Sequence, residues 1–266
     1  MLAIITDRAG GLHQFTMGRR CKREMELTLS LDPHNIDALQ LQLMMYLHAP
    51  AIWGGDTSKA QQLAEKMVQI DPAAGYLALV EIATDRHKPQ SQIEDLYWKA
   101  VKARPESYDA RVRLAQYLRS DTLRKYAEAE NQCREALRID PNRIQAYVIL
   151  AGALAAEGKW ADVESALASA SEAIPDNATP YFAVAALCLA RSVELERSER
   201  YFRRYLAQPP EYKMPSLAAA HWQLGQVLEK EGRKTEALAE FQLAAKLDPT
   251  SPARNDLKRL GSSASQ

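Results

Sequence analysis

The sequence contains little glycine and little cysteine. Its 266 residues include 11 glycines and 3 cysteines. So little glycine, together with abundant Ala, Leu, Glu and Gln, favours helix along the whole chain. The cysteines (Cys21, Cys133 and Cys188) are odd in number and far apart, so they do not have the spacing of a disulfide framework or a zinc knuckle. We therefore expect free thiols that pack as small apolar residues, which leaves the cellular compartment open.

The chain also lacks net charge and long apolar runs. It balances 34 basic against 34 acidic residues, which disfavours nucleic acid as the partner, because phosphate binding needs a basic surplus. The longest apolar run, 146–156, is about half of the roughly 20 residues that a membrane-crossing helix needs, so we predict no membrane span.

The first residues, MLAIITDRAGGLHQF, have no basic segment followed by an apolar core, so they do not resemble a signal peptide. They already lie inside an expected helix. We expect a cytoplasmic protein if Met1 is the native start, and a periplasmic or exported one if an upstream signal has been removed.

No catalytic or ligand-binding motif is present. There is no glycine-rich phosphate loop, and Gly54-Gly55-Asp56 is better interpreted as a turn followed by a helix cap. None of the five histidines has a metal-ligand spacing to another: His13, His34, His48, His87 and His221. We therefore expect no enzyme, no cofactor and no metal site.

A series of prolines is the strongest positive signal. These prolines recur at intervals of 33 to 40 residues, each where a helical pattern ends: Pro33, Pro72, Pro105, Pro141, Pro175, Pro209 and Pro249. The segment 216–249 shows the repeating unit clearly. It contains two amphipathic helical patterns on either side of Gly232, with apolar faces at Leu217, Leu224, Leu228, Ala237, Phe241 and Ala244.

This unit resembles the tetratricopeptide repeat (TPR). Leu224-Gly225, Ala237-x-x-x-Phe241 and Pro249 match the family pattern, while His221 and Leu228 replace its usual Trp and Tyr. The resemblance implies an all-α, right-handed α-solenoid of about seven stacked antiparallel helix hairpins and a C-terminal capping helix. It also implies a binding scaffold rather than an enzyme.

We assign the units from the proline series. Residues 1–33 form a leading hairpin with a turn at Gly10-Gly11, and residues 250–266 form a capping helix, 253–260, and a disordered tail. The six full repeats are 34–72, 73–105, 106–141, 142–175, 176–209 and 216–249. Within them we expect a capping box at Ser91 and Glu94. The repeat 176–209 is irregular, because Arg204 falls where small Ala is usual.

The first helices of stacked hairpins line a concave groove, so helix geometry predicts the side chains that face a partner. These are Val112, Gln116, Arg119, Val148, Gly152, Ala155, Phe182, Ala186, Leu189, Trp222, Gln226 and Glu229. Phe182 and Trp222 would be the anchors. The alternative is that the next superhelical turn or the chain's own termini cover these positions. The Lys/Asn/Arg set with which some TPR proteins clamp a terminal carboxylate is absent here.

The loop HAPAIWGGD offers a second candidate contact through Ile52 and Trp53. Its alternative is that both side chains fold back over the adjacent helices. Three functions follow from these patterns. The leading one is a scaffold that binds a protein or peptide in the groove. The others are an exported solute-binding accessory protein with a closed pocket near Phe182, and a self-association module.

Overall fold

The computed structural model describes residues 11–208 and 215–263, and every regular element in these ranges is helical. They form fourteen α-helices and one short 3-10 helix, with no strand. The predicted all-α, helical-repeat architecture is confirmed. The chain divides into two compact units, residues 1–110 and 111–266, and the boundary falls inside helix α7 (Tyr108–Leu118).

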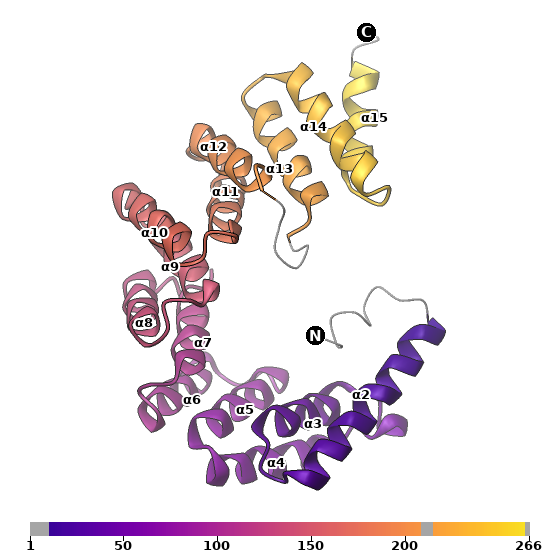
Figure 1. The fold of residues 1–266 in the computed structure, drawn as a ribbon, viewed down its shortest axis with the longest axis vertical. Coiled ribbons are helices and arrows are strands. Elements are labelled where there is room, and N and C mark those ends of the chain that lie inside the picture. Colours follow the sequence, from indigo (N-terminus) through magenta and orange to yellow (C-terminus); the bar gives the residue numbers. More distant parts are fainter. Residues whose placement is uncertain (1–10, 209–214, 264–266) are drawn as a thin grey trace. The chain divides into compact units, whose positions relative to one another are not determined.

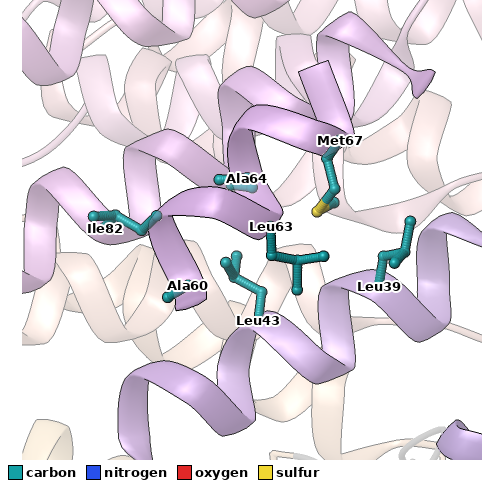
Figure 2. Packing of buried hydrophobic residues seen from close by; sticks show 8 residues of the cluster. Leu39, Leu43, Ala60, Leu63, Ala64, Met67 and Ile82 are labelled. Carbon is teal, nitrogen blue, oxygen red and sulfur yellow. The ribbon is translucent and has the colours of Figure 1, made fainter. Parts of the chain in front are cut away.

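The N-terminal unit packs each helix against the next (Figure 1). Its elements are α2 (Gly11–Leu31), α3 (Ile36–His48), η1 (Ala51–Trp53), α4 (Thr57–Ile70), α5 (Pro72–Asp85) and α6 (Gln90–Ala103). Figure 2 shows its core, in which side chains of α3, α4 and α5 meet. The cluster consists of Leu39, Leu43, Ala60, Leu63, Ala64, Met67, Ala78 and Ile82.

A single residue, Asp71, connects α4 to α5. Its carboxylate accepts a hydrogen bond from the Ala74 amide at 3.1 Å and caps α5. Pro72 therefore occupies the first turn of α5, where its missing N–H costs nothing, and does not simply close the preceding repeat. So short a connection brings the two helix backbones together at Gly75, where a Cβ atom would lie 2.2 Å from the Val68 amide nitrogen.

Two local predictions in this unit are wrong. Gly11 lies in α2 rather than in a turn, while Gly10 and the expected helix before it fall outside the described residues. The capping box at Ser91 and Glu94 does not form either. Pro89 occupies the N-cap position, so α6 begins at Gln90, one residue before the expected cap.

The C-terminal unit contains α8 (Tyr126–Ile139), α9 (Ile144–Ala156), α10 (Trp160–Ala173), α11 (Thr179–Arg191), α12 (Leu195–Leu206), α13 (Leu217–Lys230), α14 (Lys234–Leu247) and α15 (Ala253–Ser263). Helices α9, α11 and α13 contact one another in sequence and form what we call the first-helix row. Helices α8, α10, α12 and α14 pack against it and form the second-helix row (Figure 1).

The motif residues of the last repeat hold α13 against α14. Leu224, Ala237, Phe241 and Ala244 are all buried. Gly225 lies directly against the Phe241 ring, since a Cβ atom at this position would be 2.6 Å from Phe241 Cε1. The two helices thus approach each other closely at the Gly–Phe pair of the motif, as the sequence pattern predicts.

The irregular repeat 176–209 has a different register from the one its proline suggests. Arg204 is exposed, and the buried side chains of α12 are Ser198, Tyr201, Phe202 and Tyr205. The expectation that a bulky Arg204 occupies the small-residue position is therefore wrong. Tyr205 takes that position, which Ala244 holds in the last repeat. Ser198 takes the position of Ala237, and its hydroxyl donates to the Ala185 carbonyl at 2.8 Å.

Ion pairs connect successive helices of the second-helix row. Each pair joins a glutamate of one helix to a basic residue at or near the start of the next helix in the row. The glutamate directly follows a small or apolar core residue. The pairs are Glu130 with Lys159 at 3.0 Å, Glu164 with Arg197 at 3.0 Å, and Glu199 with Arg233 at 2.6 Å. Neighbouring repeats are therefore coupled by charge as well as by apolar packing.

The C-terminal helix α15 packs on α14. As predicted, the chain enters it through Ser251 and Pro252, and the Ser251 hydroxyl accepts from the Ala253 amide at 3.3 Å. The helix extends to Ser263, so the predicted end at Leu260 is three residues too early. The last three residues lie outside the described ranges.

Candidate partner-binding surface of the C-terminal unit

The described side chains include no cluster of three or more His, Cys, Asp or Glu that could hold a metal ion. No helix in the same ranges is both long and apolar enough to cross a membrane. The predicted groove residues can be placed one by one on the packed helices of the C-terminal unit.

The predicted groove residues differ in exposure. The buried ones are Val112, Gly152, Ala155 and Leu189; those of intermediate exposure are Arg119, Val148, Phe182, Ala186, Trp222, Gln226 and Glu229; Gln116 is exposed. The groove assignment stays a prediction, and neighbouring side chains cover several of its positions. At Gly152, the covering group is the guanidinium of Arg119.

Phe182 is not a free anchor. Its ring packs at 5.4 Å between centroids on Phe202 and at 5.1 Å on Tyr205, both of α12. The adjacent apolar cluster includes Ala178 and Ala220. Phe182 therefore contributes to packing within its own repeat, and the closed pocket of the solute-carrier hypothesis stays a prediction.

Trp222 is partly occupied by the chain itself. Its indole N–H donates to the Asp256 carboxylate of α15 at 2.9 Å. The same helix provides Arg259, which binds both oxygens of Glu229 at 2.5 and 2.7 Å and one oxygen of Asp256 at 2.9 Å. The hydrogen bond from Arg259 outweighs burial and lowers the pKa of Glu229. For Trp222, the alternative is therefore correct: α15, close to the C-terminal end, covers part of this end of the first-helix row.

A hollow remains beside this network, on the face where α11, α13 and α15 meet. Its volume is about 610 Å³, and its lining includes three of the predicted groove residues, Leu189, Gln226 and Glu229. The other lining residues are Ala190, Lys230, Asp256 and Arg259. Apolar side chains of α11 thus face polar and charged side chains of α13 and α15. Sequence reasoning missed Asp256 and Arg259, because it treated α15 only as a cap.

The loop between α3 and α4 holds the other candidate contact. The Asp56 amide donates to the Tyr46 carbonyl at 2.8 Å, and Gly54 has a positive φ of 101°. Asp56 caps α4 as predicted. Ile52 is 85% exposed, so the alternative that it folds back over the adjacent helices is wrong. The Trp53 side chain lies outside the described residues, and a contact role for this loop stays a prediction.

The repeat pattern can now be compared with known families. Two profiles described as tetratricopeptide repeat match the chain, one over residues 94–144 and 189–252 and the other over residues 123–188. Together the matched segments run without a gap from 94 to 252, more than half of the sequence. The chain belongs to the tetratricopeptide repeat family. Members of this family are generally scaffolds for protein–protein interaction rather than enzymes.

Solved structures with the same fold include several TPR proteins of different kinds. Yeast Tom70 matches with a TM-score of 0.63 and 17% identity, over 95% of this chain and 53% of its own. PilW, a type IV pilus biogenesis factor, matches with a TM-score of 0.59 and 18% identity, over 85% of this chain and 97% of its own.

The Cut9–Hcn1 tetramer of the APC/C matches with a TM-score of 0.56 and 16% identity, over 91% of this chain and 45% of that chain. This TPR protein therefore spans about half the length of the Cut9–Hcn1 and Tom70 chains. A comparison with curated protein sequences found no match. At these identities the likeness shows the fold alone.

Proposed function

We propose that this TPR protein is a non-catalytic scaffold whose C-terminal unit binds an extended or helical segment of a partner protein along its first-helix row. The observation that supports this most directly is the hollow between α11, α13 and α15, which contains predicted groove residues from two successive repeats. Stacked helix pairs form a continuous surface of this kind, on which a peptide contacts several repeats at once.

The lining of the hollow indicates which segment would fit. Leu189 and Ala190 form an apolar wall, and Gln226 and Lys230 provide a hydrogen-bonding and a basic group on the facing side. The charges of Glu229 and Arg259 are already paired with each other. The hollow therefore accepts a segment with an apolar side chain toward α11 and polar groups toward α13, which is the pattern of an amphipathic peptide.

The test is a peptide selection on the full chain, followed by measurement of affinity. A random peptide library displayed on phage is selected against the protein, and the enriched peptides are labelled and titrated by fluorescence anisotropy. Ala190 is exposed at the rim of the hollow, so Ala190→Trp fills it without disturbing the core. We expect this substitution to weaken binding at least about tenfold, which is a loss of about 1.4 kcal/mol.

A matched substitution provides the control. Ala161 is equally exposed but lies on α10, in the second-helix row, so Ala161→Trp adds the same side chain away from the hollow. Binding that survives Ala161→Trp and is lost in Ala190→Trp supports the proposal. No enriched peptides, or equal binding by both variants, would refute it.

A further inference from the structure

Among the residues that the structure describes, an arginine beside α9 of the C-terminal unit has no anionic partner. Arg119 follows α7, and its Nε atom is buried without a hydrogen-bond acceptor among the described residues. Within the described ranges its only side-chain hydrogen bond is a long one, 3.5 Å from Nη2 to the Gln116 side-chain carbonyl oxygen. A guanidinium moved partly out of water is costly unless a carboxylate or phosphate compensates it, so each such group requires an explanation.

The structure provides a place for this guanidinium. Arg119 lies across α9 at Gly152, where a Cβ atom would be 2.8 Å from Nη1 and 3.5 Å from Cζ. Any other residue at position 152 would push the charged group away. Gly152 interrupts an otherwise Ala- and Leu-rich helix, at a cost of about 1 kcal/mol in helix propensity relative to alanine. The glycine and the unpaired arginine are therefore two parts of one arrangement.

Comparable arginines in the same unit are paired. Arg197 is half-buried like Arg119, but it binds Glu164 at 3.0 Å and Glu194 at 2.8 Å. Arg259 binds Glu229 and Asp256. Arg119 thus differs from both in its lack of compensation, and the half-buried apolar Val148 lies one helical turn before Gly152 on α9.

From this geometry we infer that Arg119 binds the carboxylate of an aspartate or glutamate side chain within the partner segment, and that Gly152 holds the guanidinium in position for it. The inference rests on the proposed function and adds the chemistry of the ligand. Arg119 binds as a single cation and differs from the Lys/Asn/Arg set that surrounds a terminal carboxylate. An acidic side chain inside a segment is the simplest anion that one guanidinium fork can hold.

The test begins with the same phage library, in which the peptide C-terminus is joined to the coat protein, so that no terminal carboxylate is available. We expect the enriched peptides to contain a shared acidic position, and its replacement by the corresponding amide to weaken binding to the wild type about tenfold or more. In Arg119→Met the same replacement should have no effect, because the interaction that it removes is already absent. Gly152→Ala keeps the charge of Arg119 but displaces it. This variant should therefore lose less affinity than the wild type when the acidic residue of the peptide is replaced by its amide.

The outcomes separate the inference from the proposed function. If peptides bind but show no coupling between their acidic position and Arg119, the inference is overturned and the scaffold function stands. If no peptide binds, the scaffold function itself fails.

A second measurement uses the free protein. Arg119→Met should raise the melting temperature, because it removes an uncompensated charge, whereas Arg197→Met should lower it, because it removes the ion pairs with Glu164 and Glu194. An equal fall in both variants would show that the Arg119 charge is compensated within the chain, and would overturn the inference.

Discussion

The contact between α4 and α5 makes a strong prediction about Gly75. A Cβ atom at this position would lie 2.2 Å from the backbone nitrogen and 2.4 Å from the Cα of Val68. Ordinary contacts of a Cβ atom begin near 3.4 Å, so the two helix backbones would have to separate by about 1 Å. They cannot do so freely, because Asp71 alone joins the helices and Pro72 fixes the backbone at the start of α5.

Two opposing effects determine the stability of Gly75→Ala. Alanine is a better helix former than glycine by about 1 kcal/mol. Overpacking of a close helix contact costs typically about 1–3 kcal/mol, and the clash here is with backbone rather than with a flexible side chain. We expect the clash to dominate, with a net loss of about 1–2 kcal/mol in the free energy of unfolding.

Gly18 is the matched control. It lies in α2 of the same unit, and nothing is within 4 Å of the position that its Cβ would take. Gly18→Ala should therefore stabilise the unit by about 0.5–1 kcal/mol. Urea unfolding is followed by tryptophan fluorescence in a Trp160→Phe, Trp222→Phe background, so that the remaining tryptophans, Trp53 and Trp98, both belong to the N-terminal unit. A midpoint for Gly75→Ala equal to or above that of wild type would refute the reasoning.

Two further predictions concern ionisable groups. Burial raises the pKa of the Cys133 thiol to about 12 and that of Cys188 to about 11. Only Cys21 should therefore react quickly with a thiol reagent at neutral pH. Equal reaction rates for all three cysteines would contradict the packing. The hydrogen bond from Arg233 lowers the pKa of Glu199, so the pair stabilises the fold above the ordinary glutamate pKa and the stability is lost as the pH falls through the lowered value. The melting temperature of Glu199→Gln should therefore lie modestly below that of wild type near neutral pH and converge with it in acid; a constant difference would contradict this.

Much of the fold could be predicted from the sequence, because the prolines mark where helices end and the small–large residue pairs mark where two helices pack closely. A proline cannot continue a helix, and six of the seven prolines follow the last helical residue by two positions. Pro209 follows Leu206 by three, and this one-residue difference produced the error at Arg204. A short motif therefore indicates which helices form and in what order. Positions counted back from the closing proline are wrong, however, where the segment between the helix and that proline changes length.

The binding surface was harder to predict, because helix geometry gives the direction of a side chain but not what fills the space around it. The step from Val148 to Gly152 along α9 predicts a shared face and nothing about its neighbours. Only the structure shows that Arg119 lies over Gly152 and that Phe182 packs on α12. Asp256 illustrates the same limit, because its contact with Trp222 joins residues 34 positions apart.

The central claim is that the first-helix row of the C-terminal unit binds a partner segment. It is tested most directly by the affinity of a selected peptide for wild type, Ala190→Trp and Ala161→Trp, after circular dichroism shows that all three are equally helical. The account predicts tight binding by wild type and Ala161→Trp and at least about tenfold weaker binding by Ala190→Trp. Equal affinity for Ala190→Trp and wild type would show that the peptide binds elsewhere and would contradict the claim.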